Sequence, residues 1–133
     1  KGMDPYTTHG AFSWNELMTS DPEKAVAVYT ALLGWTVQKM AMPGMDYHVM
    51  KAGDTSVGGS MALPPEAAAG GMPPNWGSYV TVADVDATAR KAVELGGKVV
   101  HGPADIPGIG RFAVIIDPQG AAINVIAYAA PAG

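Results

Sequence analysis

Hydrophobic and polar residues alternate along several short stretches of this chain, while two longer stretches have the spacing of a helix. The strand-like stretch Phe12–Thr19 precedes Asp21, which suits the N-cap of a helix that we expect to end at Leu33. A glycine follows, and the next strand is predicted at Gly34–Met42. Within the helix, we expect one buried apolar stripe formed by Ala25, Val28, Tyr29, Leu32 and Leu33.

The same order of elements returns about 60 residues later, as expected for a duplicated unit. Strand Ser78–Val82, N-cap Asp84 and helix Val85–Leu95 repeat the first set of elements. Three extended segments then follow each helix: Gly34–Met42, Tyr47–Lys51 and Thr55–Leu63 in the first half, and Lys98–Gly102, Arg111–Ile116 and Ala121–Tyr128 in the second. Turn-forming runs separate them, at Pro43-Gly44-Met45-Asp46 and Asp117-Pro-Gln-Gly120 for example.

Each half therefore predicts a β-α-β-β-β unit. We expect an α+β fold in which two tandem β-α-β-β-β modules form curved mixed sheets around a cleft, on the face that the helices leave free. The predicted boundaries are a leader at 1–11 that starts with a cloning remnant, a single domain at 12–128 and a tail at 129–133. Within the domain, we expect module 12–63, a Pro- and Gly-rich linker 64–75 and module 76–128.

Composition excludes several classes of function. Apolar residues make up 48% of the 133 residues and charged ones 15%, so a packed core is expected rather than disorder. No apolar run approaches the roughly 20 residues that cross a bilayer, so we expect no membrane partner. The 8 Lys and Arg are scattered and the net charge is −4, which argues against nucleic acid. The absence of cysteine fits a reducing cytoplasm, where we expect the protein to act.

Several motifs occur in the order and spacing of one known superfamily. They are Thr19-Ser-Asp-Pro-Glu-Lys-Ala25, Val28-Tyr29 with Leu32-Leu-Gly-Trp35, Val82-Ala-Asp-Val-Asp86 with Glu94-Leu-Gly-Gly97, and Gly108-Ile-Gly-Arg-Phe112 with Asp117-Pro-Gln-Gly-Ala121. From Phe12 to Tyr128 the chain resembles the vicinal-oxygen-chelate superfamily of glyoxalase I, extradiol dioxygenases, and fosfomycin and bleomycin resistance proteins, and it is most similar to the glyoxalase-like branch. The resemblance implies a small-molecule ligand and a homodimer.

The resemblance also implies where a metal would bind in metal-using members, on inward strand positions near the start and end of each half. Those positions here are Trp14, Gly77, Asn124, and one of Gly59, Ser60 and Met61. Divalent cations prefer imidazoles and carboxylates, which this set lacks. We therefore expect no family metal site and no cofactor.

Glu16 is the candidate catalytic residue. It lies two residues after Trp14 in an apolar strand, so alternation places both side chains on one face. A carboxylate facing a partly apolar cleft can act as a base or a lone metal ligand, whereas a structural glutamate would bond to the backbone or a tyrosine. His48 is a second candidate ligand or general acid, with a surface or core histidine as the alternative. We expect His9 and His101 to be solvated.

The remaining candidates are expected to bind a ligand: Trp14, Met61, Tyr79, Arg111, Phe112 and Asn124. Arg111 is interpreted as a clamp for an anion, with a surface ion pair as the alternative, and Phe112 either lines a pocket or packs. Asn124 either bonds to a ligand or is a satisfied core amide. We interpret most methionines of the first half as core, although they also suit an adaptable apolar pocket: Met40, Met42, Met45, Met50 and Met61.

Two functions remain open at this level, and with them whether the chain is an enzyme. The first is a glyoxalase/bleomycin-resistance-like protein that binds a small, partly apolar molecule in its cleft without the usual family metal. The alternative is a metal-dependent lyase or dioxygenase-type enzyme with a displaced metal site that uses Glu16, together with His48. A structural module with a vestigial cleft is a third possibility.

Overall fold

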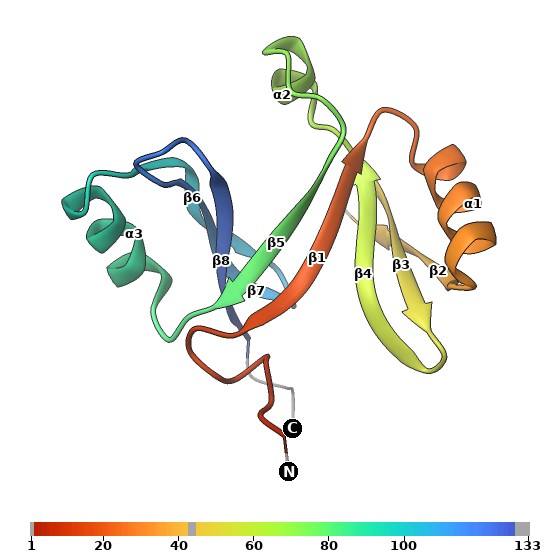
Figure 1. The fold of residues 1–133 in the computed structure, drawn as a ribbon, viewed down its shortest axis with the longest axis horizontal. Coiled ribbons are helices and arrows are strands. Elements are labelled where there is room, and N and C mark those ends of the chain that lie inside the picture. The colour runs from red at the N-terminus through yellow and green to blue at the C-terminus, as the bar shows by residue number, and fades with distance from the viewer. Residues whose placement is uncertain (1, 43–44, 130–133) are drawn as a thin grey trace. The chain divides into compact units, whose positions relative to one another are not determined.

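The fold is known from a computed structural model that describes residues 2–42 and 45–129, apart from the side chains of Met42 and Met45 (Figure 1). Positions 43 and 44 of the predicted turn and residues 130–133 of the predicted tail lie outside this part. The chain divides into two compact units. Unit 1 comprises Lys1–Ser13 and Ser78–Gly133, and unit 2 comprises Trp14–Gly77.

Unit 2 contains the first of the two predicted modules. Its elements are β1 (Phe12–Thr19, whose first two residues belong to unit 1), α1 (Pro22–Leu33), β2 (Thr36–Met42), β3 (Met45–Ala52), β4 (Thr55–Ala62) and α2 (Pro65–Ala69). The strands form a sheet in the order β2-β3-β4-β1, in which β1 runs parallel to β4 and the other neighbours are antiparallel. Helix α1 packs against β4 and β2 (Figure 1). The short helix α2 lies in the segment predicted as a linker and was not expected.

Unit 1 repeats this arrangement with the second module. Its elements are β5 (Asn75–Thr81, whose first three residues belong to unit 2), α3 (Val85–Glu94), β6 (Lys98–Ile106), β7 (Gly110–Ile116) and β8 (Ala122–Tyr128). The strand order is β5-β8-β7-β6, with β5 parallel to β8. The predicted fold class, α+β with two tandem β-α-β-β-β modules and mixed sheets, is therefore confirmed. Strand β6 continues four residues beyond the predicted segment.

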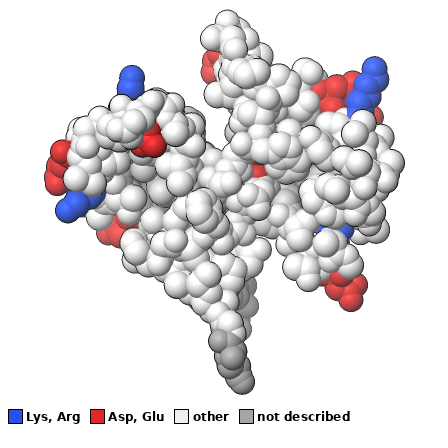
Figure 2. All heavy atoms as spheres, in the orientation of Figure 1, with Lys and Arg blue, Asp and Glu red and all other residues white. Residues whose placement is uncertain are grey.

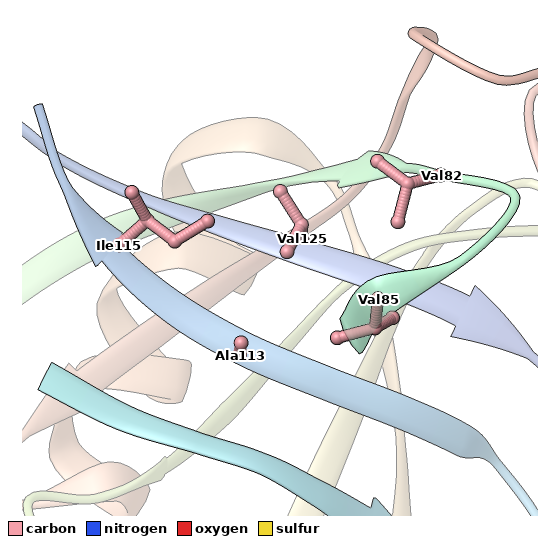
Figure 3. Packing of buried hydrophobic residues seen from close by; sticks show 5 residues of the cluster. All are labelled: Val82, Val85, Ala113, Ile115 and Val125. Carbon is pink, nitrogen blue, oxygen red and sulfur yellow. The ribbon is translucent and has the colours of Figure 1, made fainter. Parts of the chain in front are cut away.

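The core of unit 1 lies between α3 and its sheet. Figure 3 shows five of its side chains, on the strands and at the start of α3. Helix α3 contributes Val85, which is 2% exposed, and the strands contribute alternate residues. Asp84 caps this helix by accepting a hydrogen bond from the Ala87 N–H at 3.0 Å. The cluster consists of Val82, Val85, Ala113, Ile115 and Val125.

Helix α1 begins and ends where the sequence predicts, but its rotation about its own axis is different. The predicted buried stripe is wrong, because Val28, Leu32 and Leu33 are 60%, 69% and 51% exposed. The buried residue of α1 is Val26 instead. Apolar residues surround this helix on nearly every side, so their spacing does not define a single inward face.

The predicted leader is bonded to unit 1 through residues 4–11, which we call the N-terminal strap. Thr81 accepts a hydrogen bond from the Gly10 N–H at 2.7 Å and donates its own N–H to the carbonyl of Ala11 at 2.8 Å. Its hydroxyl donates to the carbonyl of Pro5 at 2.6 Å. His9, although exposed, accepts the Ala83 N–H through Nδ1 at 2.9 Å. The strap therefore belongs to the fold of unit 1.

Charged side chains are sparse on the face drawn in Figure 2. Lysine and arginine atoms occur there in small groups, and some of these groups lie next to aspartate or glutamate atoms. That face thus presents no continuous basic or acidic surface. No helix within residues 2–42 and 45–129 combines the length and apolar character needed to cross a membrane.

Candidate functional site

The sheet of unit 2 has one face turned toward α1. Lys39 of β2 forms an ion pair with Glu23 of α1 at 3.7 Å, so its side chain lies on the α1 side. The strand register places Lys39 opposite His48, His48 opposite Ser60, and Ser60 opposite Leu17. Residues opposite each other in neighbouring strands share a face, so this whole row faces α1.

Glu16 lies on the other face of the same sheet. It precedes Leu17 in β1 and is opposite Gly59, which in turn is opposite Val49. Because successive side chains of a strand alternate, Glu16 points away from α1 while His48 points toward it. The metal site predicted from Glu16 together with His48 is therefore not formed, and His48 is a buried residue beneath α1, 6% exposed.

A hydrogen-bonded chain anchors the Glu16 carboxylate. The Trp14 indole donates from Nε1 to the Tyr47 hydroxyl at 2.9 Å, and this hydroxyl donates to Oε2 of Glu16 at 2.6 Å. Glu16 is only 9% exposed, and a short bond from a phenol to a buried carboxylate is among the stronger protein hydrogen bonds. We call Trp14, Glu16 and Tyr47 the Glu16 triad. The prediction that Trp14 and Glu16 share a face holds in this geometry.

Gly59 makes room for the triad. A Cβ atom at this position would overlap the hydroxyl and ring of Tyr47, so only glycine lets the tyrosine cross β4 toward Glu16. Two residues further along the same face, Met18 is opposite Met61. The predicted ligand residue Met61 therefore lies on the face of the triad, and the surface around the carboxylate is apolar and polarisable.

The sheet of unit 1 also has a face that α3 does not cover. One row crosses all four strands, because Tyr79 is opposite Asn124, Asn124 opposite Val114, and Val114 opposite His101. The row alternates with the core residues Ala113 and Val125, so it points away from α3. We call it the Tyr79 row.

Phe112 lies on the same face as the Tyr79 row, two residues from Val114. Its ring centroid is 6.5 Å from that of Tyr79 and 5.3 Å from that of His101. The Asn124 side chain donates from Nδ2 to the carbonyl of Ser78 at 3.2 Å, which fixes the orientation of the amide. The structure thus brings together three of the predicted ligand residues: Tyr79, Phe112 and Asn124.

Arg111 does not join them. It alternates with Phe112 in β7 and donates from Nε and Nη2 to both carboxylate oxygens of Asp86 on α3, at 2.8 and 2.9 Å. Its Nη1 donates to Asp105 at 3.0 Å. The guanidinium lowers the pKa of Asp86 through these hydrogen bonds and its charge. Since two carboxylates already take its donors, the ion-pair interpretation fits Arg111 better than the anion clamp.

Two residues of these faces were not predicted. Tyr47 was missed because the sequence drew attention to its neighbour His48, and only the strand register decides which of two adjacent side chains faces Glu16. His101 was expected to be solvated; it is exposed, and its ring lies against that of Phe112 at a tilt of 35°. The adjacent pair Tyr47-His48 could have indicated a partner for Glu16, because one of the two must share a face with Glu16 if β3 and β1 belong to one sheet.

The residues around Glu16 do not suit a divalent metal. Its neighbours on that face are an indole, a phenol, a glycine and a thioether, and metals such as zinc prefer several imidazoles and carboxylates. Among residues 2–42 and 45–129, no three His, Cys, Asp or Glu side chains are grouped so as to hold a metal ion.

Two groups of four strands with the same internal order, each with a helix on one face and a candidate site on the other, define a duplicated β-α-β-β-β protein. Residues 10–125 match the model of the Glyoxalase/Bleomycin resistance protein/Dioxygenase superfamily, and the chain belongs to this family.

Relatives agree with this assignment. The chain is 48% identical over 118 residues to the "Putative glyoxylase CFP32" of Mycobacterium tuberculosis, covering 88% of this chain and 44% of the relative. It is 39% identical over 137 residues to the "Anthracycline biosynthesis protein DnrV" of Streptomyces peucetius, covering 100% of this chain and 48% of the relative. The chain thus spans about half the length of these curated relatives.

A solved structure shows the same fold. Methylmalonyl-CoA epimerase from Mycobacterium tuberculosis superposes with a TM-score of 0.68 over 93% of this chain and 92% of that chain. The sequences are 17% identical, so this likeness concerns the fold alone.

Proposed function

We propose that this chain binds a small, partly apolar molecule on the face of the Glu16 triad and that it does so without a resident metal. The observation that carries this proposal is the chain of hydrogen bonds from Trp14 through Tyr47 to Glu16, built on the face that α1 leaves uncovered. It sets one carboxylate at 9% exposure among aromatic and thioether side chains. Ligand sites commonly combine such an apolar surface with a few fixed polar groups.

The chemistry of this face favours a flat aromatic ligand that carries hydroxyl groups. The Trp14 ring and the methionines Met18 and Met61 offer polarisable surface, and methionine adapts to ligands of different outline. The Glu16 carboxylate is an acceptor for hydroxyl donors, since each of its oxygens takes more than one hydrogen bond. Two relatives with 39% identity, DnrV and DauV, are named anthracycline biosynthesis proteins, which supports a hydroxylated anthraquinone as the first ligand to test.

The test is a titration of the protein with 2,6-dihydroxyanthraquinone, in which binding is measured by isothermal titration calorimetry. We expect saturable binding in the wild type and its loss in Trp14→Ala, because the indole supplies ring surface and holds Tyr47. Trp76→Ala is the matched control. Trp76 packs against Tyr29 of α1 with ring centroids 5.3 Å apart, on the covered side of the sheet, so its removal should leave the affinity unchanged. Equal affinities in wild type and Trp14→Ala would refute the proposal.

A metal-dependent lyase or dioxygenase is the second candidate, supported by the relative named putative glyoxylase and by the buried carboxylate of Glu16. Measuring metal by mass spectrometry, on protein purified without chelator, separates the two candidates. We expect substoichiometric metal, with no change in Glu16→Gln. Zinc, nickel, iron or manganese near one equivalent, lost in Glu16→Gln, would favour the enzyme and direct work to glyoxalase and dioxygenase assays.

Two further features belong to this proposal. We infer a homodimer from the family resemblance and a cytoplasmic location from a sequence without cysteine. Light scattering of the purified chain tests the first inference, with a mass of twice 13.6 kDa expected. Localisation of a tagged chain in fractionated cells tests the second.

A further inference from the structure

The N-terminal strap is fastened to Thr81 of β5 at two separate points. The carbonyl of Pro5 accepts the Thr81 hydroxyl at 2.6 Å, and Gly10 donates its N–H to the carbonyl of Thr81 at 2.7 Å. Between these points, the Thr8 hydroxyl donates to the carbonyl of Asp4 at 2.7 Å. The strap is therefore held at both ends and within itself, and it forms a fixed wall beside the sheet of unit 1.

A pocket of about 210 Å³ lies between the strap and the ends of β5 and β8. Its lining comes from the strap, from the end of β5 with the loop that follows it, and from β8, all of which belong to unit 1. A cavity of about 150 Å³ admits benzene. Sites for drug-sized molecules are larger, with volumes of about 300–1,000 Å³. The volume of this pocket therefore suits a ligand with a single ring.

Two tyrosine rings supply the aromatic wall of this pocket. Tyr6 of the strap contacts Tyr128 of β8 edge to face, with ring centroids 5.1 Å apart and planes at 73°. The Tyr128 hydroxyl is hydrogen-bonded to that of Ser13 at 2.7 Å, which holds its ring in place. Tyr6 is 39% exposed, so part of its ring remains open to a ligand. Another aromatic ring packs favourably against such a pair.

His9 of the strap supplies a hydrogen-bond donor to the same pocket. Its Nδ1 accepts the Ala83 N–H at 2.9 Å, so this nitrogen carries no proton. The proton of the imidazole is then on Nε2, which makes Nε2 a donor. His9 is exposed, and no hydrogen bond within residues 2–42 and 45–129 uses its Nε2. An oxygen atom of a ligand can therefore accept a hydrogen bond from it.

The lining of the pocket favours an uncharged ligand. Among the described residues, its polar side chains are the His9 imidazole and the hydroxyls of tyrosines and threonines, with no Lys, Arg, Asp or Glu. The nearby carboxylate of Asp4 accepts the Tyr6 N–H at 2.9 Å and would repel an anion. Burying a charge without a partner is costly, whereas a neutral carbonyl oxygen needs only a donor. The pocket thus suits a carbonyl better than a carboxylate.

We propose that this pocket binds an uncharged one-ring aromatic molecule whose carbonyl oxygen accepts the Nε2–H of His9 and whose ring lies against Tyr6 and Tyr128. The pocket belongs wholly to unit 1, whereas the Glu16 triad belongs to unit 2. The two sites share no residue and differ in the size of their ligands. The proposal therefore goes beyond the proposed function and can fail or succeed independently of it.

The experiment is a titration followed by proton–nitrogen correlation NMR spectra, in which the amides of the pocket report on binding there. The ligands are acetophenone, ethylbenzene, which has the same outline without the carbonyl oxygen, and benzoate, which carries a charge. His9→Phe keeps a ring and removes the donor nitrogen. Ala83→Leu fills the pocket, and Ala87→Leu at an exposed position of α3 is its matched control. The same spectra show whether each variant is folded.

We expect acetophenone to shift the amide signals of Ala83 and Tyr128 saturably and to bind about fivefold more tightly than ethylbenzene, the order of one hydrogen bond. Benzoate should bind more weakly than acetophenone. His9→Phe should bind acetophenone and ethylbenzene equally, Ala83→Leu should bind neither, and Ala87→Leu should behave as the wild type.

Three results would overturn the proposal. The first is equal affinity of the wild type for acetophenone and ethylbenzene, or for acetophenone and benzoate. The second is undiminished binding of acetophenone to folded Ala83→Leu. The third is the absence of shifts at the pocket amides of the wild type, whatever happens elsewhere in the spectrum.

Discussion

The hydroxyl of Tyr47 accepts one hydrogen bond and donates another, and this dual role makes it the centre of the Glu16 triad. Its donation to Glu16 and its acceptance from Trp14 fix two side chains from β1 with one side chain from β3. The sequence predicted both β1 residues because they alternate in a single strand. It could not predict Tyr47, because a contact between strands depends on a register that no single strand reveals.

Gly59 and Tyr47 are expected to be strongly coupled. Gly59→Ala forces the Tyr47 ring away from Glu16, and we expect it to cost about 1–3 kcal/mol through the lost hydrogen bonds of a buried charged group. In a Tyr47→Ala background the ring is absent, so the same substitution should cost much less. A double-mutant cycle measured by urea unfolding tests this coupling. Additive effects of the two substitutions would show that residue 59 tolerates a methyl group beside the tyrosine.

At the scale of elements, the two helices of the duplicated modules differ in how clearly the sequence defines their orientation. Helix α3 separates polar from apolar residues and buries Val85 and Ala89 as its pattern indicates. Helix α1 is apolar on most sides, and the predicted inward residues Val28 and Leu32 are exposed. The ends of both helices were predictable because the N-caps Asp21 and Asp84 act locally. Rotation about the helix axis is decided by packing.

The ion pair between Arg111 and Asp86 joins β7 to α3 and should make stability depend on acid. Arg111 lowers the pKa of Asp86 from its ordinary value of 3.8, so the pair stabilises the fold fully above about pH 4. That stabilisation is lost as the pH falls through the lowered pKa. We therefore expect wild type to exceed Asp86→Asn in urea midpoint at pH 6 and the difference to shrink as the pH falls below 3.8 toward 2.

The control for this prediction is Asp54→Asn in the exposed turn between β3 and β4, which should leave the midpoint unchanged at every pH. Because the side chains of the pair are 39% and 43% exposed, added salt should also reduce the wild-type advantage. A difference that persists undiminished at pH 2 would contradict an electrostatic origin.

For the whole molecule, the duplicated module order was predictable because the same sequence landmarks recur in the second half at a nearly constant separation of about 60 residues. The division into two compact units was not, since β1 and β5 each straddle a unit boundary at Ser13 and Gly77. The candidate site was predictable in part. Trp14, Glu16 and Met61 share one face, and Tyr79, Phe112 and Asn124 share another. Arg111 instead points toward α3, where it pairs with Asp86. This pairing was not predictable, because Asp86 lies 25 residues away in the sequence.

Each unit is expected to respond to changes in its own core. Ile115→Ala removes a side chain that is 6% exposed within the unit 1 cluster, and we expect a loss of about 2–5 kcal/mol in the free energy of unfolding. Leu95→Ala, at a position that is 67% exposed, should change it by less than about 0.5 kcal/mol. Hydrogen exchange should show the lost protection in β7 and β8. Equal effects of the two substitutions would contradict the described core.

Because unit 1 is built from two segments that lie far apart in the sequence, its strands cannot all pair as soon as they leave the ribosome. Unit 2 is continuous and can close once Gly77 has emerged, whereas unit 1 combines the strap with residues from Ser78 onward. Strand β5 pairs in parallel with β8, and its Tyr79 partner Asn124 is made 45 residues later. At about 5–20 residues per second, β5 waits about 2–9 s for that neighbour. Thr81 can meanwhile bond to the strap, which is already outside the ribosome, so the end of β5 is held on the edge away from β8 while the β8 edge stays unpaired.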